Sequence, residues 1–122
     1  MVKIEIRAEA HELPATVLAE LAERYPDCSS AEDWRRRANH EGSYYIDLTR
    51  VVELPEVPRV GDHVSIGTDD LSDATVELVT WFLDGGPSGA TVAITLNYLE
   101  FSDVRDEWAA LEELLADGWE PS

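Results

Sequence analysis

Apolar and charged residues alternate without a break along residues 2–9, from Val2 to Glu9. A repeat of two is typical of a β-strand that buries one face. Residues 43–54, "SYYIDLTRVVEL", are rich in β-branched and aromatic side chains, which favour extended structure. These two segments are therefore predicted to be strands.

Helical spacing appears between and after these strands. An apolar stripe of Leu18, Leu21 and Tyr25 begins after Pro14 and ends before Pro26, and a shorter helix is predicted near 31–39. A last helix is predicted near 103–117, capped by Ser102 or Asp103 and ended by Gly118. Its apolar stripe should pack on the sheet and consists of Val104, Trp108, Leu111 and Leu115.

Two further segments indicate how the remaining strands connect. Pro55 and Pro58 cannot donate ladder hydrogen bonds, so residues 55–62 are predicted to form a corner that turns at Gly61-Asp62 into a strand at 63–67. A proline-recognition or ligand loop is the alternative. The stretch "VGDHV" resembles the first turn of SH3-like barrels.

The next two strands are predicted at 74–84 and 91–101, joined by the turn-forming loop "DGGPSGA" and paired antiparallel. The order β-α-α-β-β-β-β-α predicts a single α+β domain over residues 1–122. Its antiparallel sheet should have about five strands and be curved, SH3-like or barrel-like, with two helices in the N-terminal half and one near the C-terminus.

Composition limits the setting of this domain. The chain is 44% hydrophobic, enough for a packed core, and no apolar run approaches the roughly 18 residues of a membrane helix. Cys28 is the single cysteine, which favours a reducing cytoplasm and a loop thiol without catalytic role.

Charge is the strongest signal in the sequence. The formal net charge is −17, which excludes nucleic acid as a direct ligand because phosphates require Lys and Arg. Residues 1–61 hold 12 acids and 8 bases, whereas residues 62–122 hold 14 acids and one base, Arg105. This asymmetry favours an interaction surface in the second half.

Motifs for chemistry are weak. There is no P-loop, dinucleotide fingerprint or zinc spacing, and neither a cofactor nor a metal is expected. The three histidines, His11, His40 and His63, are far apart and are interpreted as surface residues rather than as a site assembled in space. The "WRRR" cluster at 34–37 is expected to pair with acids of the same chain rather than with a phosphate.

The turn "GTDDLSDA" at 67–74 places three carboxylates, Asp69, Asp70 and Asp73, within five residues. They could bind Ca²⁺, but the spacing lacks the alternation and final glutamate of an EF-hand loop, so a solvated turn is the preferred interpretation.

Acids also crowd the end of the last helix, where the macrodipole disfavours negative charge. Such a locally unfavourable arrangement favours a functional surface. Trp119, which follows the helix, would either fold back on the core or stay exposed as an anchor. The predicted partner-binding residues are Asp69, Asp70, Asp73, Asp106, Glu107, Glu112, Glu113, Asp117 and Trp119.

The leading hypothesis is a small non-enzymatic cytoplasmic protein that binds a basic protein partner, in the manner of an inhibitor, an immunity protein or a nucleic-acid mimic. Neither a membrane nor direct nucleic-acid binding is expected. One alternative is a housekeeping or assembly domain whose acidity reflects a salt-adapted or GC-rich host. Another is a small ligand-binding barrel or enzyme with a site between the sheet and the last helix.

Overall fold

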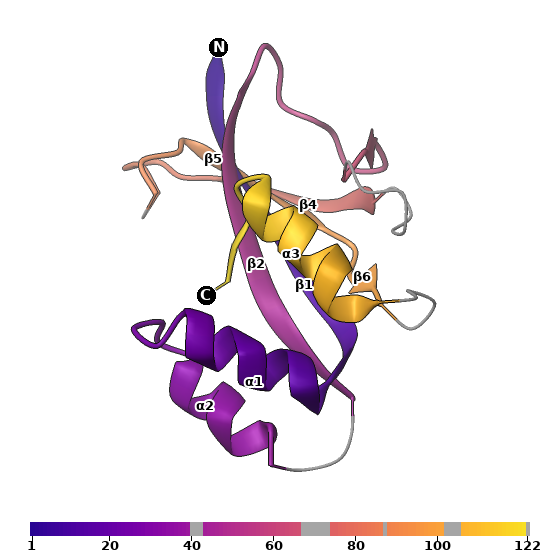
Figure 1. The fold of residues 1–122 in the computed structure, drawn as a ribbon. Helices are drawn as coiled ribbons and strands as arrows, with labels where there is room; N and C mark the ends of the chain where they lie inside the picture. The colour runs from indigo at the N-terminus through magenta and orange to yellow at the C-terminus, as the bar shows by residue number, and fades with distance from the viewer. Residues whose placement is uncertain (40–42, 67–73, 87, 102–105, 122) are drawn as a thin grey trace.

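The computed structural model describes residues 1–39, 43–66, 74–86, 88–101 and 106–121. It contains three helices and seven strands among these residues (Figure 1). The elements are β1 (Val2–Pro14), α1 (Ala15–Arg24), α2 (Ala31–Arg37), β2 (Ser43–Leu54), β3 (His63–Val64), β4 (Ala74–Trp81), β5 (Val92–Leu96), β6 (Leu99–Glu100), α3 (Glu107–Ala116) and β7 (Glu120–Pro121). None of the described helices has the length and apolar content needed to cross a bilayer.

The sheet is mixed, with the strand order β3-β4-β5-β1-β2-β7, and β6 also pairs with β1. The α+β class and a curled, barrel-like sheet are confirmed. The predicted SH3-like antiparallel sheet of about five strands is matched only in part, because the sheet is mixed and has seven strands. β1 runs antiparallel to β2 and parallel to β5 and β6. The reason is that the corner after β2 carries the chain around the sheet, so β5 returns beside β1.

β1 extends to Pro14, beyond the predicted strand 2–9. An irregularity interrupts its alternation of buried and exposed residues, and the strand continues after it. The register with β2 shifts between Ala10 and Leu13, and Glu12 adopts a φ of 62°. A bulge of this kind bends a strand and increases its twist. The prediction stopped where the strict repeat of two stops, although the pairing continues to Pro14.

The hairpin of β4 and β5 is confirmed as antiparallel, with Trp81 opposite Val92. Both strands are shorter than predicted. After Leu96 the chain leaves β5, and the Asn97 side chain accepts a hydrogen bond from the Thr75 backbone N–H at 2.7 Å. It then rejoins β1 as β6, opposite Ala10.

The corner at 55–62 is also confirmed. Gly61 has a φ of 95°, which favours glycine, and its N–H donates to the Val76 carbonyl at 2.9 Å. The Asp62 carboxylate accepts a hydrogen bond from the Arg59 N–H at 2.8 Å. The Gly61 bond holds the corner against β4, and the Asp62 bond closes the turn within the corner.

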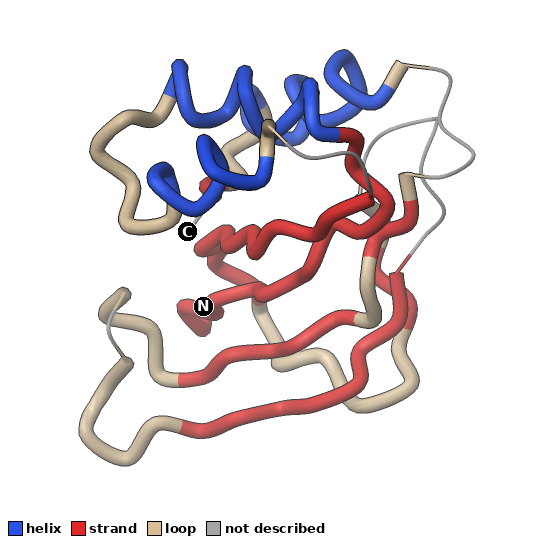
Figure 2. The backbone as a smooth tube through the Cα atoms, turned by 90° about the horizontal axis from the view of Figure 1, so that it is seen from below, coloured by secondary structure: helices blue, strands red, loops and turns tan. Residues whose placement is uncertain are grey.

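The three helices lie on the same side of the sheet (Figure 2). On α1 two residues of the predicted stripe, Leu18 and Leu21, are fully buried, whereas Tyr25 is the C-cap and is only partly buried. On α3 Leu111 is fully buried, whereas Trp108 and Leu115 are only partly buried.

The remaining predictions for α3 have mixed outcomes. Ala110 and Leu114, which the predicted stripe omitted, complete the buried face of this helix. Ser102, Asp103 and Val104 lie outside the described residues, and the N-cap is Asp106. Gly118, with a φ of 107°, follows the C-cap Asp117, as predicted.

Candidate functional site

α3 carries most of the predicted partner-binding acids. Asp106 caps the helix, and its carboxylate accepts a hydrogen bond from the Ala109 backbone N–H at 3.1 Å. The other acids of this helix and its exit lie on its outer side: Glu107, which is partly buried, and Glu112, Glu113 and Asp117, which are exposed. Asp69, Asp70 and Asp73 lie outside the described residues, and so does the possible Ca²⁺ site.

Two of these acids have basic partners from distant parts of the chain. Arg24 at the end of α1 forms an ion pair with Glu112 at 3.0 Å, and its guanidinium lies 5.0 Å from the centre of the Trp108 ring. Arg50 on β2 forms an ion pair with Asp117 at 2.9 Å. Arg24 and Arg50 therefore compensate two of the acids at the end of this helix, whereas Glu113 forms no ion pair with another described residue.

Trp119 folds back on the core and is only 3% exposed. Of the two predicted alternatives the structure therefore shows the first, and Trp119 is not an exposed anchor, because the turn at Gly118 directs the indole inward. Its Nε1–H has no hydrogen-bond partner among the described residues. A hollow of about 360 Å³ lies beside it, where the end of α3 meets β7, lined by Tyr25, Leu115, Gly118, Trp119, Glu120 and Pro121.

The basic cluster on α2 pairs within the chain, as predicted. The Asp33 carboxylate forms ion pairs with Arg36 and with Arg37, the latter at 2.9 Å. The hydrogen bond from Arg36 is the main cause of the lowered pKa of Asp33. The Arg37 guanidinium also lies 5.8 Å from the centre of the Tyr44 ring.

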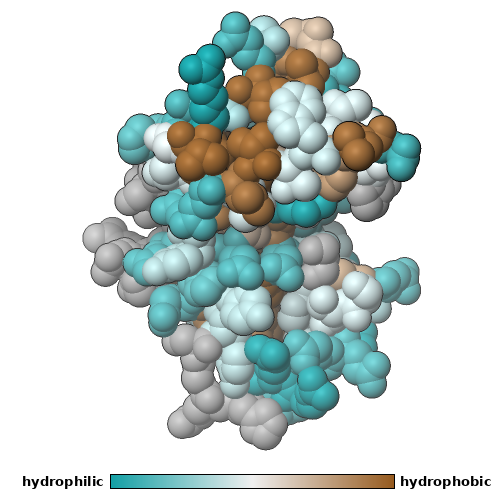
Figure 3. Space-filling view, turned by 180° about the vertical axis from the view of Figure 1, so that it is seen from behind, coloured by the Kyte–Doolittle hydropathy of each residue, from teal (hydrophilic) through white to brown (hydrophobic). Residues whose placement is uncertain are grey.

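The sheet face turned away from the helices holds a second group of side chains. On β1 the residues from Ile4 to Ala10 with even numbers are buried, so Arg7, Glu9 and His11 point to the opposite, open face. Figure 3 shows this side of the molecule, with an apolar region above a more polar one. Leu78, which is opposite Thr95 in the register, is 55% exposed.

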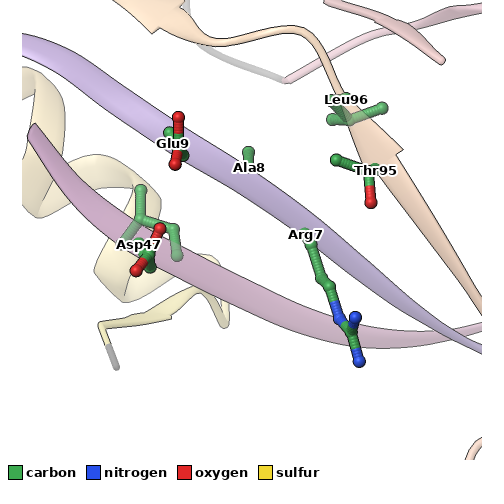
Figure 4. A pocket seen from close by; sticks show the side chains of 7 residues that line it. Arg7, Ala8, Glu9, Asp47, Thr95 and Leu96 are labelled. Atoms are coloured by element: carbon green, nitrogen blue, oxygen red, sulfur yellow. The ribbon is translucent and has the colours of Figure 1, made fainter. Parts of the chain in front are cut away.

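A hollow of about 290 Å³ opens between β1, β2 and β5 (Figure 4). It forms where β5 leaves β1, because direct pairing ends at Arg7 and Thr95 and resumes only at Ala10 with β6. Its lining consists of Arg7, Ala8, Glu9, Asp47, Leu48, Thr95 and Leu96.

Two carboxylates face each other at this hollow. Glu9 on β1 is the register partner of Asp47 on β2. The Cβ atoms of directly opposite residues are about 4.5–5.5 Å apart, and like charges in this position destabilise a sheet. Both carboxylates are exposed at the rim of the hollow. Partial desolvation raises the pKa of Asp47, and the neighbouring Glu9 charge raises it further, while His11 acts in the opposite direction.

His11 holds one of these carboxylates in place. Its Nε2 lies 3.0 Å from Glu9 Oε1. The imidazole stacks on two aromatic rings, with centroid distances of 5.3 Å to Tyr45 and 4.5 Å to Tyr98. His11 is therefore not an ordinary surface histidine, and its ring is fixed between the end of β1, β2 and the segment before β6.

The positive charge at the hollow is already neutralised. Arg7 Nε donates to Glu5 Oε2 at 2.6 Å, and the Arg7 guanidinium lies 5.6 Å from the centre of the Phe82 ring. Glu5 is 8% exposed. With His11 neutral, the formal charges of Glu5, Arg7, Glu9 and Asp47 sum to −2, so the hollow is negative.

Sequence reasoning missed this site because it depends on register. The alternation of residues 2–9 shows that Arg7 and Glu9 share a face, but it does not show which residue of 43–54 lies opposite each.

Among the described residues no group of three or more His, Cys, Asp or Glu side chains has metal-binding geometry. His63 is exposed on β3, and His40 lies outside the described residues.

No family model matches the chain, and no curated protein or solved structure shows significant similarity to it.

Proposed function

We propose that the chain is a non-enzymatic protein that binds a basic protein partner through carboxylates of its helical layer, which consists of α1, α2 and α3. The observation that carries this proposal is the surplus of acidic over basic residues, which gives a net charge of −17. Several arginines are already paired within the chain, with Glu5, Asp33, Glu112 and Asp117. The acidic residues that have no basic partner carry the net negative charge, which attracts basic molecules over long range.

The helical layer presents part of this surplus on one side of the molecule. The Arg24–Glu112 ion pair connects α1 to α3, and both helices cover the same face of the sheet (Figure 2). Glu20 on α1 and Glu113 on α3 are exposed and form no ion pair with another described residue. They are therefore available to a partner without breaking a bond within the chain.

A basic protein fits this surface better than a small cation does. Each exposed carboxylate contributes little as a single ion pair, and a protein can contact carboxylates of two helices at once. Opposite charge across an interface mainly accelerates association. The partner class includes nucleases and other nucleic-acid-binding proteins, whose basic channels accept an acidic surface in place of phosphates. A reducing compartment such as the cytoplasm would keep Cys28 as a free thiol.

The test begins with capture of partners on the immobilised chain from a native lysate, elution with a salt gradient and identification by mass spectrometry. Association of the captured protein is then measured with Glu113→Lys and with Glu56→Lys, which makes the same charge change on the corner at 55–62. We expect Glu113→Lys to slow association several-fold and Glu56→Lys to have a smaller effect. Equal on-rates for the two variants would remove α3 from the binding surface.

Thermal melting tests the salt-adaptation alternative. If the acids serve only salt tolerance, the fold should depend on molar salt, because self-repulsion is unscreened at low salt. We expect the melting temperature to change little between 0.05 and 1 M NaCl, on the order of a few degrees, because the ion pairs hold opposite charges closer together than the screening length. Unfolding at low salt would favour the alternative.

A further inference from the structure

We propose that the hollow on the open face of the sheet binds an organic cation, a primary ammonium or guanidinium group, between Glu9 and Asp47. This site lies on the opposite side of the sheet from the helices, so it does not depend on the proposed function of the helical layer. The ligand would place its charged end between the two carboxylates and its apolar part along the hollow.

The arrangement of the two acids is the first reason. Glu9 and Asp47 are register partners on neighbouring strands, an unfavourable position for two negative charges. Neither Glu9 nor Asp47 forms an ion pair with Lys or Arg among the described residues, although four arginines elsewhere pair with acids. A cation between them would remove the repulsion and satisfy both carboxylates.

Pre-organisation is the second reason. The His11 ring is fixed between Tyr45 and Tyr98, and it holds the Glu9 carboxylate at 3.0 Å. A carboxylate that is already oriented loses little conformational freedom when a ligand binds. The raised pKa of Asp47 has desolvation as its main cause and the neighbouring Glu9 charge as its second, while His11 lowers it.

The size and polarity of the hollow select the class of cation. About 290 Å³ is far more space than a bare metal ion requires. No described trio of His, Cys, Asp or Glu has metal-binding geometry. Thr95 supplies a hydroxyl, and the other residues of the lining include Ala8, Leu48 and Leu96, which are buried in the core (Figure 4). An anion is disfavoured because Arg7 is already paired with Glu5.

The same cationic group could come from a free amine or guanidine, or from a Lys or Arg side chain of a polypeptide. We would titrate the ¹⁵N-labelled chain with butylguanidine, with butylamine and with N-acetyl-arginine amide, at constant ionic strength and neutral pH, and follow backbone amide shifts. Saturable shifts confined to the strands around residues 7–9, 47 and 95 are expected, and NaCl at the same concentration should not produce them. Binding of the blocked arginine would assign the site to a polypeptide side chain, and binding of the small cations alone would assign it to a free ligand.

Substitutions at Glu9 and Asp47 test whether the cation binds in this hollow. Asp47→Asn and Glu9→Gln should each weaken binding about tenfold or more, because each removes a charge-assisted hydrogen bond. Glu53→Gln is the matched control: it removes the same charge from the open face, opposite Lys3 and outside the hollow, and should change the affinity less than twofold. Well-dispersed spectra of all three variants would show that they are folded. Shifts that follow ionic strength alone, or equal affinity for Asp47→Asn and Glu53→Gln, would overturn the proposal.

Discussion

The ion pair between Arg50 and Asp117 leads to a prediction about stability: the effect of Asp117→Asn on the free energy of unfolding should depend on whether Arg50 is present. Asp117 is the C-cap of α3, where the negative end of the helix dipole makes a carboxylate unfavourable by about 0.3–1 kcal/mol. Arg50 Nη1 lies 2.9 Å from its Oδ2, with side chains 32% and 53% exposed. An ion pair as exposed as this contributes about 0.2–1 kcal/mol.

These two contributions have opposite signs and similar size. Asp117→Asn in the natural chain should therefore change the free energy of unfolding by less than about 0.5 kcal/mol. In an Arg50→Met background, which keeps much of the apolar stem but removes the charge, Asp117→Asn should stabilise the fold by about 0.3–1 kcal/mol. The difference between the two backgrounds is the coupling energy of the pair.

Urea denaturation followed by circular dichroism measures all four proteins of this cycle. The slope with denaturant should stay constant, so that midpoints report stability. Raising NaCl to 1 M should reduce the coupling, since exposed charges are screened at that concentration. If Asp117→Asn has the same effect in both backgrounds, Arg50 does not compensate the helix end, and the reasoning about α3 fails.

Three further predictions concern single sites. Asp47→Asn should stabilise the fold at neutral pH by less than about 1 kcal/mol, since the raised pKa means that charged Asp47 is disfavoured in the folded state; the gain should vanish as the pH falls below the unfolded-state pKa, which urea denaturation at two pH values would show. Gly118→Ala should destabilise by about 1–2 kcal/mol because of its φ of 107°, with Gly118→Asn costing less in the same assay. Phe101→Ala should cost about 3–5 kcal/mol because this ring is fully buried, whereas Tyr98→Ala, at a 53% exposed position, should cost far less in a thermal melt; equal losses would contradict the burial argument.

Local signals in the sequence predicted the elements that depend on neighbouring residues. The hairpin of β4 and β5 follows from apolar runs around a Gly/Pro loop, and α1 follows from the spacing of Leu18 and Leu21. The end of α3 follows from Gly118. In each case the residues that decide the structure belong to one continuous stretch of the chain.

Long-range pairing could not be obtained in this way. Nothing local distinguishes a β1 that pairs with β5 in parallel from one that lies at the edge of an antiparallel sheet. The compensation of Asp117 by Arg50 spans 67 residues, and the opposition of Glu9 and Asp47 depends on the register of two long strands. The site on the open face was missed for the same reason, because its members become neighbours only in the folded sheet.

The central position of β1 has a consequence for how the chain reaches this fold. Ile4 pairs with Val92, 88 residues later in the chain, so the sheet closes only through contacts of very high sequence separation. Topologies of this kind fold slowly, because the loss of chain entropy precedes the gain from pairing. At a synthesis rate of about 5–20 residues per second, the ribosome would produce β5 roughly 4–18 s after β1. Over that interval β2 is the neighbour available to it, and the edge of β1 that later accepts β5 stays open to chaperones or to aggregation.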